Sequence, residues 1–309
     1  YMIIVGLLLV VSQLPALLLK LLLMPAAKHF GYVVEYAYSL RLCKLHVLIE
    51  RFTQSCFGKR PYHSRCIDVR SELPLEPEGH CYVHPLPCMT NNFAYLLVDA
   101  TQDAVKAASD SQAGLSCCLV DPCDASAVVE LVELLAEGTY AEFGGLIIEA
   151  VACTHKHWDH AGGNTDLRSW AKKASARAGG GASASSCAAP APRLRWTADL
   201  PVYGGHDDAI PGRTHPLESG ERFSVGRLEL EALAVPGHTA GSTAFCVRNL
   251  RREAADRDSA LDAVFSGDCL FSGGCGAPFE GSNLDMEHCF ASLIQRCEPS
   301  RTLLFSGPR

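Results

Sequence analysis

The chain has 309 residues, of which 48% are hydrophobic and 20% charged, so it can bury the core of one large domain or two ordinary ones. Its formal net charge of -7 lacks the basic excess that neutralises phosphates, which argues against nucleic acid as a partner. The 15 cysteines are odd in number and scattered, which favours reduced and mostly buried thiols over a disulfide framework.

The N-terminal part of the chain begins with an apolar run at residues 2–24, long enough to cross a bilayer core of about 30 Å as a helix. We predict a transmembrane anchor over 1–28, with a cleaved signal peptide as the alternative. An interfacial helix and linker are expected over 29–80, unless that helix packs on the chain itself. Basic residues follow the run and hardly precede it, which favours a single-pass membrane protein whose main domain faces the cytosol.

The remaining residues, 81–309, have the pattern of an α/β domain in which helices cover a sheet. Apolar spacing predicts a helix at 125–138. Strands are predicted at 93–98, 117–120, 146–153, 201–203, 227–233 and 263–265. Between them, the segment of about 171–197 is rich in Ala, Ser, Gly and Pro, which predicts a disordered surface insert.

A cluster of polar side chains follows the predicted strand 146–153 directly. Within six residues the chain places His155, His157, Asp159 and His160. Histidines two apart in an extended loop can converge on one cation, and the next two side chains can serve a second. Removing so many polar groups from water at a strand end is costly unless a cation coordinates them, so the run predicts a metal site.

The sequence T-H-K-H-W-D-H-A-G-G at 154–163 resembles the signature of the metallo-β-lactamase superfamily, an αββα sandwich with a metal pair at one edge. Segments 235–242 and 265–271 resemble two further motifs of that superfamily, in the expected order. The resemblance implies a pair of zinc ions bound by six side chains: His155, His157, Asp159, His160, His238 and Asp268. By the same resemblance, His238 binds the first ion and the Asp268 carboxylate bridges the two ions. Asp159 has a catalytic role, because it orients the nucleophile.

Within the superfamily, the chain is most similar to the glyoxalase II (hydroxyacylglutathione hydrolase) group, and especially to its branch typified by the paroxysmal nonkinesigenic dyskinesia protein. The resemblance covers about 81–307 and includes segments 153–160, 210–217 and 272–281. It implies that zinc-activated water hydrolyses a small-molecule thioester of the glutathione type. That branch also has an N-terminal membrane-associated stretch.

Two departures from the group's pattern concern the substrate and the second metal. Ala277 and Phe279 stand where the group has a basic residue and, in many members, a tyrosine that hold glutathione. The chain reads Ser-Gly-Pro-Arg at 306–309, where the group has its last metal-binding histidine and a further helical domain. We therefore expect a C-terminally truncated domain with a weakened second metal site and impaired activity.

Two alternatives to a zinc thioesterase stay open at this point. One is a persulfide-dioxygenase-like enzyme of the same superfamily, in which His155, His238 and Asp268 hold a single iron ion. The other is a membrane-tethered scaffold that keeps the fold and one metal without turnover. Metal analysis separates the first alternative, because zinc supports hydrolysis and iron supports oxidation.

Overall fold

The computed structural model describes residues 71–75, 79–89, 92–179, 192–248, 263–297 and 302–307. The chain divides into two compact units, Tyr1–Ile49 and Glu50–Arg309. The described residues all belong to the second unit, so the account below is of that unit alone. The anchor predicted over 1–28 and most of the helix and linker predicted over 29–80 lie outside these residues.

The membrane location predicted from the sequence is corrected by the structure. None of the helices in the described ranges is both long enough and apolar enough to span a bilayer. Residues 2–24, on which that prediction depended, are not among the residues described.

The first of two sheets formed by the described strands has eight strands, in the order β1-β2-β3-β4-β5-β7-β8, with β6 pairing with β5. Their bounds are β1 Ser71–Leu75, β2 Gly79–Cys88, β3 Asn92–Thr101, β4 Leu115–Val120, β5 Leu146–Cys153, β6 Leu194–Trp196, β7 Val202–Gly205 and β8 His215–Leu217. Strands β4, β5 and β7 are parallel neighbours. Their carboxyl ends therefore lie at the same edge of the sheet.

The second sheet has five strands, in the order β13-β12-β11-β10-β9. Their bounds are β9 Arg222–Val225, β10 Leu228–Ala234, β11 Thr243–Arg248, β12 Ala263–Gly267 and β13 Leu303–Ser306. Strand β11 is antiparallel to both β10 and β12, and β13 is parallel to β12. The carboxyl ends of β10, β12 and β13 therefore also share one edge.

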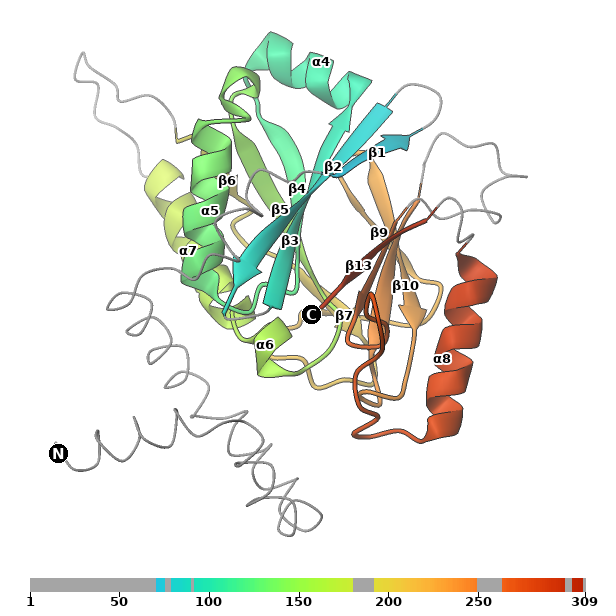
Figure 1. The fold of residues 1–309 in the computed structure, drawn as a ribbon. Coiled ribbons are helices and arrows are strands. Elements are labelled where there is room, and N and C mark those ends of the chain that lie inside the picture. Colours follow the sequence, from blue (N-terminus) through green and yellow to red (C-terminus); the bar gives the residue numbers. More distant parts are fainter. Residues whose placement is uncertain are drawn as a thin grey trace, which may run out of the picture. The chain divides into compact units, whose positions relative to one another are not determined.

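Helices cover the outer face of each sheet (Figure 1). Their bounds are α4 Gln102–Ser111, α5 Ala125–Glu137, the 3-10 helix η2 Ala141–Phe143, α6 Trp158–Ala161, α7 Asn164–Gly179 and α8 Asn283–Arg296. One apolar cluster joins α5 and α7 to the first sheet, a second fills the space between the sheets, and a third joins α8 to the second sheet. The layers are thus α, β, β and α, as the predicted fold class requires.

The predicted helix at 125–138 shows how local sequence and packing agree. Asp124 caps its first turn by accepting hydrogen bonds from the backbone of Ser126 and Ala127. Val128 and Val132, one turn apart, are fully buried against the sheet. The helix ends at Glu137, and the predicted strand at 146–153 is β5 without any change of bounds.

The predicted insert and linker are shorter in the structure than expected. Helix α7 continues to Gly179, because Leu167 and Ala171, four residues apart, are both fully buried on the sheet. Strand β6 takes up 194–196, so only 180–191 of the expected insert lies outside the described residues. The expected linker contains β1, which pairs with β2, so the sheet begins before residue 81.

Candidate metal centre

The ligand-bearing loops all leave strand ends at one edge of the sandwich. Strand β5 leads into residues 154–157, β10 leads into the loop with His238, and β12 leads into Asp268. The backbone turns tightly here: a Cβ at Gly163 would meet the carbonyl oxygen of Pro122 at 2.1 Å. A glycine at this position lets the turn after α6 pack directly on the loop that follows β4.

Three histidine nitrogens converge where two of these loops meet. His155 Nε2 lies 3.1 Å from His157 Nδ1, and His238 Nε2 lies 2.9 Å from the same nitrogen of His157. One ligand atom from each ring lies within 4.8 Å of the others. Two nitrogens about 2.0–2.1 Å from a tetrahedral zinc ion would be about 3.3 Å apart. The donor set and its spacing therefore fit one such ion.

A second group of possible ligands consists of His155, His160 and Asp268. His160 Nε2 lies 3.0 Å from Asp268 Oδ1. Both atoms are buried, and neither makes a hydrogen bond within the described part of the chain. Leaving such atoms unpaired costs free energy, so their mutual orientation fits a cation between them. Asp268 also approaches the first group, since its Oδ2 is 3.4 Å from His238 Nε2.

Asp159, the remaining predicted ligand, lies beside these groups and belongs to neither of them. Its Oδ2 is 3.8 Å from His160 Nε2, and its side chain is 29% exposed. The structure thus brings together His155, His157, His160, His238 and Asp268 from three separate segments. Asp159 is placed at their rim, in contact with solvent.

Hydrogen bonds away from the centre orient the histidine rings. His160 Nδ1 lies 2.8 Å from Asp121 Oδ2, and His238 Nδ1 lies 2.8 Å from the carbonyl oxygen of Ala277. His155 Nδ1 lies 3.1 Å from Thr154 Oγ1, and that hydroxyl itself donates to Asp121 Oδ2 at 2.7 Å. In each ring Nδ1 can donate to these acceptors, which leaves Nε2 free of a proton for a metal ion.

The electrostatic surroundings of the rings differ. Burial, aided by the neighbouring histidines, holds the pKa of His155 well below its usual range, so this ring is neutral and able to coordinate. Burial opposes a charge on His160, but Asp268, Asp121 and Asp159 outweigh it and raise its pKa well above the usual range. Burial likewise opposes the Asp268 carboxylate, yet His160 lowers its pKa. Coordination at His160 therefore requires a cation to replace a proton.

Asp121 is a functional residue that the sequence did not reveal. The Asp-Pro pair at 121–122 predicts only the end of a strand. In the structure Asp121 has a left-handed backbone with φ of 49°, and its Oδ1 accepts from the backbone nitrogen of Thr154 at 2.7 Å. A non-glycine residue in this conformation is held by its surroundings. The sequence did contain one signal: Asp121 follows β4, and β4 lies next to β5, the strand that leads into the ligand loop.

Asp208, which follows β7, is a second missed residue and joins the two histidine loops. Its Oδ2 accepts from the backbone nitrogen of Lys156 at 2.8 Å and from Thr239 Oγ1 at 2.9 Å. Lys156 lies between two predicted ligands, and Thr239 follows the third. Lys156 Nζ in turn lies 3.3 Å from Asp208 Oδ1 and 2.5 Å from Glu280 Oε1. Asp208 is therefore placed to fix the spacing of the ligand loops.

We expect Asp208→Ala to weaken zinc binding by about 10- to 100-fold, because it releases both loops from a common buried acceptor. Asp208→Asn keeps one acceptor oxygen and is expected to lose less. Zinc affinity is measured by competition with a chromophoric chelator. Asp207→Ala is the matched control, since that neighbouring carboxylate is 75% exposed. Equal affinities for the Asp208→Ala and Asp207→Ala variants would contradict the role assigned to Asp208.

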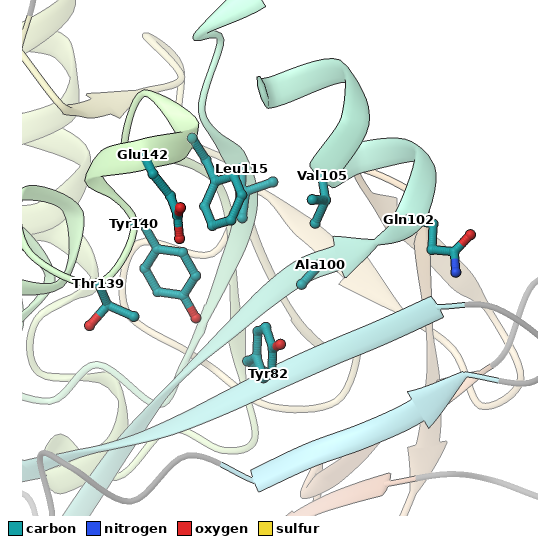
Figure 2. A pocket seen from close by; sticks show the side chains of 9 residues that line it. Tyr82, Ala100, Gln102, Val105, Leu115, Thr139, Tyr140 and Glu142 are labelled. Atoms are coloured by element: carbon teal, nitrogen blue, oxygen red, sulfur yellow. The ribbon is translucent and has the colours of Figure 1, made fainter. Parts of the chain in front are cut away.

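A cavity of about 330 Å³ lies elsewhere on the first sheet (Figure 2). It is lined by residues of β2, the end of β3, α4, the start of β4 and the segment that leads into and forms η2, including Ala100, Val105, Leu115 and Tyr140. Because β3 and β4 are antiparallel, the end of β3 and the start of β4 lie opposite the edge that carries the ligand loops. No member of the two candidate ligand groups lines this cavity.

The architecture and the site together define an α/β sandwich with a histidine-rich metal centre at one edge. Residues 117–252 match the family model described as the metallo-beta-lactamase superfamily. The chain is 26% identical over 225 residues to a hydroxyacylglutathione hydrolase of Dictyostelium discoideum, an alignment covering 73% of this chain and 65% of that protein. It is 33% identical over 181 residues to the hydroxyacylglutathione hydrolase of Shewanella baltica, covering 57% and 51%.

Among solved structures, a metallo-beta-lactamase of Staphylococcus aureus is 21% identical, with a TM-score of 0.44 over 70% of this chain and 53% of that one. Residues 117–252 are thus similar to the metallo-β-lactamase superfamily, and both curated relatives are named hydroxyacylglutathione hydrolase. It spans less than two thirds of the length of these relatives. The finer resemblance to one branch of that group stays a prediction.

Proposed function

We propose that this chain is a metal-dependent hydrolase that uses zinc at the candidate centre to cleave small-molecule thioesters. The observation that supports the proposal most is the convergence of His155 Nε2, His157 Nδ1 and His238 Nε2 at one point. The substrate class comes from the relatives' name, hydroxyacylglutathione hydrolase, which denotes an acyl group carried by glutathione.

In this proposal, each group at the centre has a separate task. When bound, zinc lowers the pKa of a coordinated water to about 7 and polarises a carbonyl group. The three converging nitrogens would hold the first ion, and His160 with Asp268 would offer ligands for a second. Asp159, partly exposed beside His160, is placed to accept a hydrogen bond from the attacking water and to orient it. The water oxygen bonds to the acyl carbon as the carbon–sulfur bond breaks; one proton of the water goes to the sulfur to give the thiol, and the other is released to solvent as the acid ionises to a carboxylate.

The full chain loaded with zinc is expected to release thiol from S-lactoylglutathione, although slowly, because Ala277 and Phe279 replace the residues that hold glutathione in the group; a thiol-reactive dye follows the release. His238→Ala should lower that rate by at least about 100-fold, because it removes a direct ligand of the metal. Mutating residues that only orient the ligands already lowers activity by up to about 100-fold. Removing the metal with a chelator should abolish the rate, and zinc should restore it. A rate that survives His238→Ala, or that returns with iron(II) but not with zinc, would contradict the proposal.

A further inference from the structure

We infer that the rim of the centre selects thioesters with an apolar group over those with an anionic group, and that Phe279 makes this selection. The inference rests on the proposed function and names the substrate class for the same site. Phe279 is 58% exposed, an unusual state for a large aromatic side chain. Its ring centroid lies 5.2 Å from that of His238 and 5.9 Å from that of His157. An apolar surface thus borders two proposed ligands of the first ion.

The loop that carries Phe279 is fixed on both sides. The backbone nitrogen of Gly276 donates to the carbonyl oxygen of Asp268 at 2.7 Å, and that of Gly281 donates to Gly237 at 2.9 Å. Ala277 accepts from His238 Nδ1, and Glu280 Oε2 accepts from the backbone nitrogen of Ala240 at 2.9 Å. The phenyl ring is therefore held at the rim before any substrate arrives, as in a preformed binding surface.

The cationic side chain beside this loop, Lys156, offers little to an anionic substrate group, because it is already paired. Lys156 stands between His155 and His157 in the sequence. Its ammonium group is already paired with the carboxylates of Glu280 and Asp208. One lysine and two carboxylates leave a formal charge of -1. Lys156 is therefore already engaged and is not offered to a carboxylate of the substrate, whereas an apolar group gains contact with the Phe279 ring.

The apolar group can belong to the acyl half or to the thiol half of the substrate, and two series of probes distinguish these cases. The first series keeps N-acetylcysteamine as the thiol and compares phenylacetyl with succinyl as the acyl group. The second keeps acetyl as the acyl group and compares benzyl mercaptan with 3-mercaptopropionate as the thiol. We expect kcat/KM to favour the apolar member by at least about tenfold in one series.

Phe279→Ala should reduce that preference to about twofold or less, and Phe279→Leu should retain most of it, because leucine restores an apolar contact. The ring is exposed, so neither variant is expected to impair folding. A preference that Phe279→Ala leaves unchanged, or a preference for the anionic members, would overturn the inference while leaving thioester hydrolysis intact.

If the zinc-loaded chain hydrolyses none of the probes, the proposed function fails, and binding then tests the rim by itself. Isothermal titration with the corresponding thioethers, which cannot be hydrolysed, measures the same selection without turnover. Tighter binding of the phenyl thioether than of the carboxylate thioether, lost in Phe279→Ala, would support an apolar ligand at this rim. Equal binding of the two thioethers would overturn it.

Discussion

Replacing His155 with alanine is expected to remove zinc from the chain and to lower thioester hydrolysis by at least about 100-fold. His155 is the one residue that belongs to both groups of candidate ligands. It is also buried and neutral, so its loss leaves a cavity at the centre and no substitute donor among its neighbours in the loop 154–157. Bound zinc, measured by elemental analysis of the purified chain, should fall from about one ion per chain to near zero.

His206→Ala serves as the matched control for this experiment. His206 follows β7 near the same edge, but its side chain is 56% exposed and contacts only the surface acids Asp207 and Glu218 among the described residues. Both variants are compared by circular dichroism to verify that they are folded. The placement of the centre would be wrong if the two variants kept equal amounts of zinc.

Replacing Pro308 with histidine is expected to raise bound zinc from about one to about two ions per chain and to increase the hydrolytic rate at least about tenfold. The backbone of Gly307 passes close to the second group of ligands: a Cβ there would lie 2.4 Å from Asp268 Oδ1 and 2.8 Å from His160 Cε1. The resemblance to the glyoxalase II group implies a metal-binding histidine directly after this glycine, so position 308 is where we add an imidazole. Proline offers no donor to a cation, whereas an imidazole adds one.

Pro308→Ala is the control for the gain, because it removes the proline without adding a ligand. The second ion should appear only in the histidine variant, and His160→Ala introduced into that variant should remove it again. A Pro308→His variant with the zinc content and the rate of the parent chain would mean that residue 308 does not reach His160 and Asp268.

Local sequence was sufficient where a feature is encoded within a few residues. The run at 154–160 places four polar groups after a buried strand, and β5 and α5 have clear apolar spacing, so both their positions and the metal-binding loop could be predicted. His238 and Asp268 lie 81 or more residues beyond His157. They could be assigned only by resemblance, because their proximity depends on how β10 and β12 are arranged.

Features that depend on tertiary contacts could not be predicted from the sequence. Helix α4 buries Ala108 fully and packs Ala104 and Val105 only partly against the core, so its apolar stripe is short and the segment appears polar. Strand β2 contains Pro85 and Pro87, which normally exclude a central strand. The described pairing with β1 reaches Val83, so among the described residues these prolines have no partner strand on that side. Asp121 and Asp208 are single acids after strands, and only the fold shows which backbone groups they bind.

The proposed centre is tested most directly by anomalous X-ray diffraction from crystals of the zinc-loaded chain, recorded on both sides of the zinc absorption edge. The account predicts a peak in the anomalous difference map about 2.0–2.1 Å from His155 Nε2, His157 Nδ1 and His238 Nε2. A zinc peak elsewhere in the molecule, with none among these three nitrogens, would contradict it.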